Sequence, residues 1–146
     1  MSGIGDPSQY YFKDGLWTFD GSVWRPQSQL FGVRSGYHEA PENGDAASGT
    51  NYVNGSTVPA GEIWVVTAIA AVNFGTAACV IKLHAGPSGS EIQMDQTDYY
   101  TPTRAVFRAL WLPLIAGDRA RAEFQGCTLH DRVVLELHGF KFKVAE

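Results

Sequence analysis

EIWVVTAIAAV, residues 62–72, is an apolar run rich in β-branched side chains, and it decides the fold class of this chain. Turn-forming residues bound the run, with VPAG before it and NFG after it. A run of this length between turn signals is typical of a strand that is covered on both faces. The chain of 146 residues also holds sixteen glycines and seven prolines, so we expect many turns joining short strands.

The neighbouring segments carry strand and turn signals of their own. Asn54-Gly55 is the pair that a type I′ hairpin turn prefers, and Pro59 followed by Gly61 predicts a second bend. CVIKLHA (79–85) alternates between two faces, which predicts a strand with one face on a core and the other at water or at a subunit contact. A weaker strand is expected near EIQM (91–94).

Two further segments flank the turn signal IAGD. The first is AVFRALWLPL (105–114), and the second is RARAEF (119–124). In the second segment Ala120, Ala122 and Phe124 alternate with charged side chains, a period that a helix would not produce. We predict that the two segments pair as a hairpin.

The last strand signal, DRVVLELHGFKFKV (131–144), contains an irregularity. Its hydrophobic side chains share one parity up to Leu137 and the other parity from Phe140 onward. A regular strand would turn half of them away from the core. Because glycine tolerates the left-handed backbone of a β-bulge, we predict a bulge near Gly139 that restores the inward face.

Together these signals predict an all-β fold, an antiparallel β-sandwich of jelly-roll-like type with an N-terminal β-ribbon arm. The sandwich is expected over residues 51–146. Residues 34–50, rich in Gly, Ala, Ser, Asn and acidic side chains, indicate a linker or long loop. Residues 1–33 are expected to form the arm.

The arm is unusually aromatic, and the pairs Asp14-Gly15 and Asp20-Gly21 mark turns between its short strands. A ribbon this short is marginal in water and needs a surface to lie on. Three interpretations stay open: the ribbon completes the core of its own chain, it docks on a neighbouring subunit or partner, or its rings stack on sugars. The rings concerned are Tyr10, Tyr11, Phe12, Trp17, Phe19 and Trp24.

Charge and hydropathy exclude several partner classes. The net charge is −4 and the eleven Lys and Arg residues are scattered, whereas nucleic-acid binding needs clustered cations. The N-terminus lacks the charged and apolar regions of a signal peptide, and no apolar run approaches the ~18 residues of a membrane span. We therefore expect a soluble protein that binds neither nucleic acid nor membrane and is not exported by a signal peptide.

The histidines show no metal-binding spacing. No two of them stand where one face of a strand or helix would hold both beside a carboxylate, and no HxH motif occurs. We therefore expect no metal and no other cofactor. The four are His38, His84, His130 and His138.

Other reactive side chains also give no catalytic pattern. Cys79 and Cys127 stand in apolar or turn contexts, which indicates two buried free thiols rather than a disulfide. Asp95 and Asp98 are expected to form turns rather than a carboxylate pair. Neither a G-x-S-x-G motif nor a phosphate-binding glycine pattern occurs, so we expect no catalytic residues and no enzyme.

Several passages resemble a known class of proteins. TVPAGEIWVVTAIAAVN (57–73), PLIAGDRARAEFQG (113–126) and VVLELHGFKF (133–142) resemble the small β-sandwich modules of structural proteins in tailed bacteriophages. FKDGLWTFDGSVWRPQ (12–27) is similar to short DG..W.p units of phage tail and fibre proteins. Together these passages cover about two thirds of the chain.

The resemblance implies a virion component without catalytic activity, most specifically a capsid decoration protein that binds and stabilises the capsid lattice. It implies the major capsid protein or another virion protein as partner, a homo-oligomer with a trimer favoured, and assembly in the host cytoplasm. The arm would bind the partner by apolar burial and by ion pairs from two arginines. The partner-binding residues are then Tyr10, Tyr11, Phe12, Trp17, Phe19, Trp24, Arg25 and Arg34.

Two alternatives remain. The chain could be a neck, tail or fibre subunit, to which the same resemblance extends. It could also be a carbohydrate-binding or receptor-binding module of a phage tail, in which Tyr99, Tyr100 and Trp111 or the N-terminal rings stack on sugars. The acidic stretch from Glu39 to Asp45 carries no assigned role in either case.

Overall fold

The computed structural model of this chain describes residues 17–19, 24–26, 35–75, 77–97 and 102–144, the first two segments by their backbone. Throughout this part the protein is all β. None of the described residues belongs to a helix with the length and apolar character that crossing a membrane would require.

Eleven strands make up the described part, in two groups by position along the chain. The first group is β1 (Trp17–Phe19), β2 (Trp24–Pro26), β3 (Ser35–Glu39), β4 (Glu42–Asn43) and β5 (Gly49–Asn54). The second group is β6 (Glu62–Asn73), β7 (Val80–Pro87), β8 (Ile92–Gln96), β9 (Ala105–Leu114), β10 (Asp118–Cys127) and β11 (Val133–Lys143).

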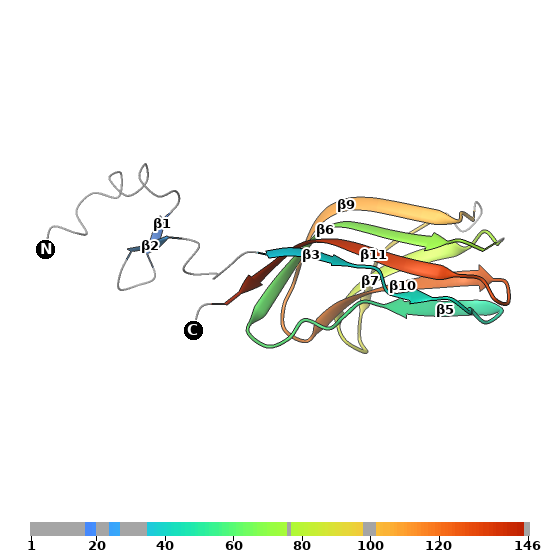
Figure 1. Cartoon of the computed structure of the whole chain (residues 1–146), viewed down its shortest axis with the longest axis horizontal. Coiled ribbons are helices and arrows are strands. Elements are labelled where there is room, and N and C mark those ends of the chain that lie inside the picture. Colours follow the sequence, from blue (N-terminus) through green and yellow to red (C-terminus); the bar gives the residue numbers. More distant parts are fainter. Residues whose placement is uncertain (1–16, 20–23, 27–34, 76, 98–101, 145–146) are drawn as a thin grey trace, which may run out of the picture.

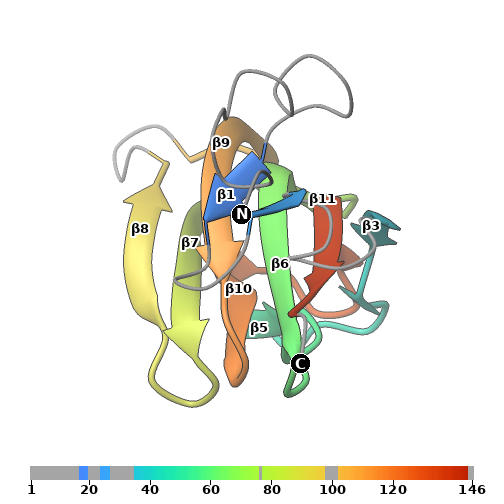
Figure 2. The ribbon, with the colours of Figure 1, turned by 90° about the vertical axis from the view of Figure 1, so that its left-hand side faces the viewer.

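Two antiparallel sheets pack face to face and form a β-sandwich (Figures 1 and 2). One sheet has the order β5-β10-β7-β8, and the other has the order β3-β11-β6-β9, with β4 paired to β11. The pairings are nested, because β3 pairs with β11, β5 with β10, β6 with β9 and β7 with β8. Nested pairing across two sheets is the topology of a jelly roll, which confirms the predicted fold class.

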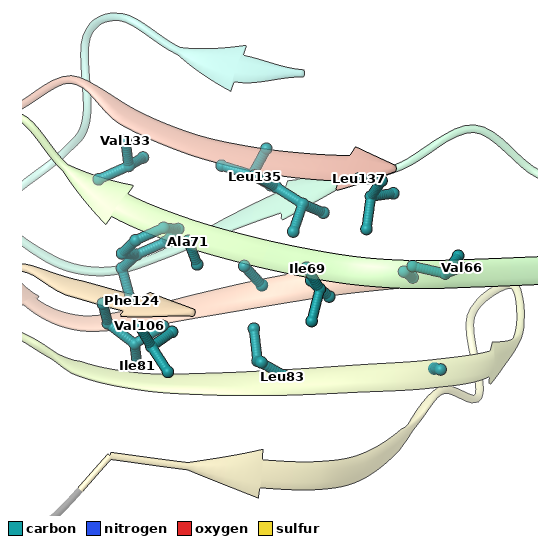
Figure 3. Close-up of a cluster of buried hydrophobic side chains, with 14 of the residues drawn as sticks. Val66, Ile69, Ala71, Ile81, Leu83, Val106, Phe124, Val133, Leu135 and Leu137 are labelled. Carbon is teal, nitrogen blue, oxygen red and sulfur yellow. The ribbon is translucent and has the colours of Figure 1, made fainter. Parts of the chain in front are cut away.

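The core lies between the sheets and follows the alternation of the strands (Figure 3). Ile81 and Leu83 of β7 point into it from one sheet, and Ile69 of β6 and Leu135 of β11 point into it from the other. Each is fully buried, and burial of a side chain of this size contributes roughly 1.5–3 kcal/mol. The predicted inward face of residues 79–85 is therefore confirmed. The prediction that the other face lies at water or at a subunit contact is wrong for Val80 and His84, which are buried within the chain.

Strand β6 covers the core with its inner face only. Ile69 and Ala71 are fully buried, whereas the outward-facing Ala68, Ala70 and Val72 are half-buried. The prediction that residues 62–72 are covered on both faces therefore holds for the inner face, and on the outer face it holds only for Val65, which is 6% exposed.

A bulge lies beside Gly139, but the extra residue is on β6. His138 pairs with Ala68 and Gly139 pairs with Val66, so Thr67 is the unpaired residue. Strand β6 changes parity there, from Trp64 and Val66 facing inward to Ile69 and Ala71 facing inward. The predicted position near Gly139 is confirmed, but the prediction that β11 itself is bulged is wrong.

Strand β11 keeps a regular alternation through the bulge region. Leu137 is buried, and Phe140 and Phe142 share the outward parity of His138 and are half-buried. Gly139 does not have a positive φ, so the left-handed backbone proposed for it is also wrong. Its role is to allow a close approach of β6.

Both predicted hairpins are wrong, because each connection crosses between the two sheets. Strands β5 and β6 flank Asn54-Gly55 but pair in different sheets, as do β9 and β10 on either side of Ile115–Asp118. The predicted bend after Pro59 is confirmed, since the backbone amide of Glu62 donates to the Pro59 carbonyl at 3.3 Å. Gly117 has a φ of 92°, so the turn between β9 and β10 needs a glycine there.

Residues 34–50 were predicted as a linker or long loop, and most of the described part is instead built into the sandwich. Strand β3 is an edge strand on β11, and β4 pairs with the start of β11. Tyr37 of β3 is buried against Trp64, with ring centroids 4.8 Å apart. Glu39 holds β3 to the connection after β5 by accepting hydrogen bonds from the Ser56 amide at 2.9 Å and hydroxyl at 2.7 Å.

The arm contains the predicted ribbon. Strands β1 and β2 pair antiparallel, with Trp17 opposite Pro26 and Phe19 opposite Trp24. The turn at Asp20-Gly21 that would join them lies outside the described residues, as does the turn at Asp14-Gly15.

Candidate functional site on the outer face of the β3-β11-β6-β9 sheet

The sheet β3-β11-β6-β9 has one face on the core and one face outward, and we call the second the outer sheet face. The register aligns one row of residues across it: His38 of β3, His138 of β11, Ala68 of β6 and Ala109 of β9. A second row contains Glu136, Ala70 and Phe107. Small alanines on β6 thus separate a polar side of the face from an aromatic side.

The polar side is a cluster of His38, Glu136 and His138, which we call the histidine cluster. One ring nitrogen from each histidine and one carboxylate oxygen lie within 4.8 Å of one another. Nε2 of His138 is 2.9 Å from Oε1 of Glu136, and Nε2 of His38 is 3.4 Å from the same oxygen. The two imidazole rings have centroids 4.5 Å apart at an interplanar angle of 34°.

Strand geometry explains why these three side chains meet. Glu136 and His138 are two residues apart on β11, so both point to the outer face. His38 is directly opposite His138, a position at which side chains interact across strands. Hydrogen bonds from His138 first and His38 second lower the pKa of Glu136, so the carboxylate is charged at neutral pH.

The sequence analysis missed this cluster. It stated that no two histidines share a face of a strand beside a carboxylate, and the structure contradicts that statement for His38 and His138. The sequence could have predicted that Glu136 and His138 share a face of the last strand, because they are two residues apart. It could not predict that His38 lies beside them, because residues 34–50 were assigned to a linker.

The aromatic side of the outer sheet face is carried by edge strand β9. Val106 is buried and Leu110 packs against the core, so the alternate side chains Phe107, Ala109 and Trp111 point outward. Phe107 is 62% exposed and Trp111 is 70% exposed. Rings of this kind bury ~150–250 Å² when covered, so the two together leave on the order of 250 Å² of aromatic surface in water.

Exposed apolar side chains gather along this edge of the sandwich. Among the described residues nine large hydrophobic side chains are exposed, and five of them lie on β8, on β9 or directly after β9. Those five are Ile92, Met94, Phe107, Trp111 and Ile115. Between the two sheets an ion pair of Asp95 with Arg108 closes the same edge.

The predicted partner-binding residues fall mostly outside the described part. Tyr10, Tyr11, Phe12 and Arg34 lie outside the described residues. For the remaining four the structure gives the ribbon backbone and its register, with Thr18 opposite Arg25, and their role stays a prediction. Those four are Trp17, Phe19, Trp24 and Arg25. Of the rings assigned to sugar binding, Tyr99 and Tyr100 lie outside the described residues, and Trp111 is exposed.

Other titratable groups have separate partners. His84 is buried on the outward side of β7, with its Nε2 3.2 Å from Oε2 of the buried Glu123. Asp95 forms an ion pair with Arg108 and lies in strand β8 rather than in the predicted turn. His130 has a positive φ of 69° and forms an exposed pair with Asp45.

The two thiols are free and buried, as predicted. Cys79 and Cys127 lie with their Sγ atoms 3.9 Å apart. Burial raises the pKa of the Cys127 thiol to about 12, and the nearby Cys79 adds to the shift. The Cys127 thiol is therefore protonated at neutral pH.

Comparisons with known proteins add no neighbour to this description. No protein-family model, no curated protein and no solved structure matches the chain.

Proposed function

We propose that this chain is a non-enzymatic structural protein of a virus particle, most specifically a decoration protein that binds and stabilises the capsid lattice of a tailed bacteriophage. The observation that carries the proposal is the exposed aromatic edge with Phe107 and Trp111. An apolar surface of this kind on a folded domain marks a site of association. Tryptophan and other aromatic residues dominate the energy of protein interfaces.

The fold supports the same proposal. Jelly rolls recur in viral capsid proteins and in lectins, so the topology suits both association with a lattice and sugar binding. Fold alone does not determine function, and the resemblance of residues 57–73, 113–126 and 133–142 to phage sandwich modules gives the viral role its preference.

Two contacts are proposed. The ribbon around Trp17 and Trp24 binds the major capsid protein or another virion protein, with Arg25 and Arg34 pairing with acidic residues there. The aromatic edge of β9 packs against a second copy of this chain in a homo-oligomer, a trimer being favoured. In such a contact the histidine cluster would lie toward the polar rim and Phe107 and Trp111 toward the apolar centre.

The test uses particles of the virus whose genome encodes this chain. We expect the full-length chain in purified particles, at a constant ratio to the major capsid protein by quantitative mass spectrometry. The double variant F107S/W111S should be depleted from the particles about tenfold, because it removes the apolar centre of the contact between copies, and separate copies lose the avidity with which an oligomer binds the lattice. Absence of the unaltered chain from the particles would contradict the proposal.

A matched control separates association from stability. Phe74 is also exposed, at 56%, but it follows β6, with the Arg132 guanidinium over its ring, and is not part of β8 or β9, so F74S should leave particle content unchanged. Equal depletion by F74S would mean that loss of exposed apolar area in general, and not the β9 edge, explains the result.

A second function is favoured by one observation, the exposed indole of Trp111. A flat ring at an open edge can stack on a sugar, as a carbohydrate-binding or receptor-binding module of a phage tail would require. Quenching of tryptophan fluorescence by glycans, lost in W111S and kept in F107S, would favour this second function over decoration.

A further inference from the structure

We propose that the histidine cluster binds a divalent transition-metal ion of the zinc class, held by Nε2 of His38, Nε2 of His138 and the carboxylate of Glu136. The inference concerns the polar side of the outer sheet face. It does not depend on the proposed virion role, because it uses different residues and a different readout.

Donor spacing is the first argument. Zinc-to-ligand distances of ~2.0–2.1 Å in a tetrahedron place neighbouring donor atoms about 3.3 Å apart. The distances from Oε1 of Glu136 to the two ring nitrogens, 2.9 and 3.4 Å, lie close to this value. The three donors all lie within 4.8 Å, so a side-chain rotation is enough to bring the ring nitrogens to the same spacing.

The donor set is the second argument. Imidazole nitrogen and carboxylate oxygen are ligands of Zn²⁺, and two histidines with one glutamate form a set that this ion accepts. Three protein ligands leave a fourth position of the tetrahedron open. His38 and His138 are exposed, so the cluster is accessible to an ion from solution and the open position is accessible to water.

The hydrogen-bonded cluster and the metal-bound cluster differ in which ring nitrogens carry the protons. A neutral imidazole carries one N–H, so a hydrogen bond from both histidines to Glu136 requires both Nε2 atoms to be the protonated ones. The 3.4 Å separation between His38 and Glu136 is also long for such a bond. To hold an ion, both histidines would carry their N–H on Nδ1, so that the two Nε2 lone pairs and the carboxylate face the ion together.

Position in the fold gives the ion a structural effect. Strand β3 is an edge strand that β11 holds on one side, and His38 and His138 are opposite each other in that pairing. An ion bound to both would fasten β3 to β11. Because binding to the native state alone stabilises it, zinc should raise the temperature of unfolding.

The experiment measures zinc binding to the full-length chain by isothermal titration calorimetry in a chelator-free buffer, with thermal unfolding as a second readout. We expect one ion per chain. Each of H38Q, E136Q and H138Q should weaken binding by at least ~10-fold and abolish the zinc-dependent rise in unfolding temperature. Cobalt substituted for zinc should give the absorption bands of a four-coordinate site.

The matched control is H130Q. His130 is an exposed histidine beside a carboxylate, Asp45, but it belongs to a pair rather than to a cluster of three donors. Its replacement should leave zinc affinity unchanged. If the unaltered chain fails to bind zinc, if the three cluster variants bind it as tightly as the unaltered chain does, or if H130Q abolishes binding, the proposal is wrong and the cluster is a hydrogen-bonded group only.

Discussion

Gly139 of β11 lies directly against the backbone of Val65 in β6, so closely that a Cβ atom on residue 139 would lie 1.8 Å from the Val65 carbonyl oxygen. The contact occurs at the bulge in β6, where Thr67 is left unpaired. Strands β11 and β6 form the centre of their sheet, so this approach fixes how the two central strands meet.

We predict that G139A destabilises the protein by more than ~2 kcal/mol, because the added methyl group meets backbone atoms that cannot rotate away. Urea unfolding followed by circular dichroism measures the change. The control is G36A on β3, where an added Cβ meets nothing within 4 Å, and we expect a change within about 0.5 kcal/mol. Equal stability of the two variants would show that β6 shifts to accommodate the methyl group.

Local alternation predicted the core-facing side chains of β10, because neighbouring side chains of a regular strand alternate between its two faces. It failed for Phe140 and Phe142, which lie on the outward face of β11. Ala120, Ala122 and Phe124 were assigned to one face of a strand, and all three are fully buried. The pairing of strands was not predictable in the same way. Asn54-Gly55 and the turn before Asp118 have hairpin residues, yet each joins strands of different sheets, and the choice between a hairpin and a crossover is made by the packing of the two sheets.

The histidine cluster shows the same division between local and long-range information. The spacing of Glu136 and His138 places both on one face, and this is local. The approach of His38 depends on the pairing of β3 with β11, across about a hundred residues of chain. Strand β3 itself was missed because its composition is polar, and its place in the sheet depends on one buried residue, Tyr37, which packs on Trp64.

A second prediction concerns a buried polar network at one end of the sandwich. The Asn73 amide donates to Oδ2 of Asp131 at 2.8 Å and to the Ala77 carbonyl at 3.2 Å, and Oδ1 of Asn73 accepts from the Gly75 amide at 2.8 Å. N73A would remove the side-chain amide that these groups bond to, and we expect it to lower the free energy of unfolding by about 1–3 kcal/mol. Urea unfolding of N43A, in which only an exposed hydrogen bond to Asp45 is lost, should show a smaller change. Similar losses in both variants would contradict a special role for the buried network.

A third prediction concerns acid stability. Burial raises the pKa of Glu91, but hydrogen bonds from Arg119 and from the backbone amides of Glu91 and Gly89 outweigh it and lower the pKa to about 2 from 4.5. Glu91 also lies 3.2 Å from Arg121. Since the folded state binds this proton less readily than the unfolded state, the stabilisation is complete above pH 4.5 and is lost as the pH falls toward 2.

We therefore expect E91Q to lower the free energy of unfolding by about 1–3 kcal/mol at neutral pH. Between pH 4.5 and 2 the free energy of unfolding of this variant should depend less on pH than that of the unaltered chain. Urea midpoints measured across this range test the prediction. The control is E42Q, which removes an exposed pair with Arg132 and should cost at most about 1 kcal/mol. A pH profile of E91Q parallel to that of the unaltered chain would assign the acid sensitivity to other carboxylates.

The last prediction concerns the thiols Cys79 and Cys127. Both are buried, so a reagent in solution does not reach them, and burial also raises the pKa of Cys127 to about 12, so little Cys127 thiolate exists at pH 8. We expect neither thiol to react with a disulfide reagent at this pH until the sandwich opens, so that the reaction rate rises with urea in parallel with unfolding. The variant S88C, with its new thiol in the exposed turn between β7 and β8, should react at once with one equivalent of the reagent. Rapid reaction of the unaltered chain without urea would mean that the end of the sandwich holding both thiols opens locally while the rest stays folded.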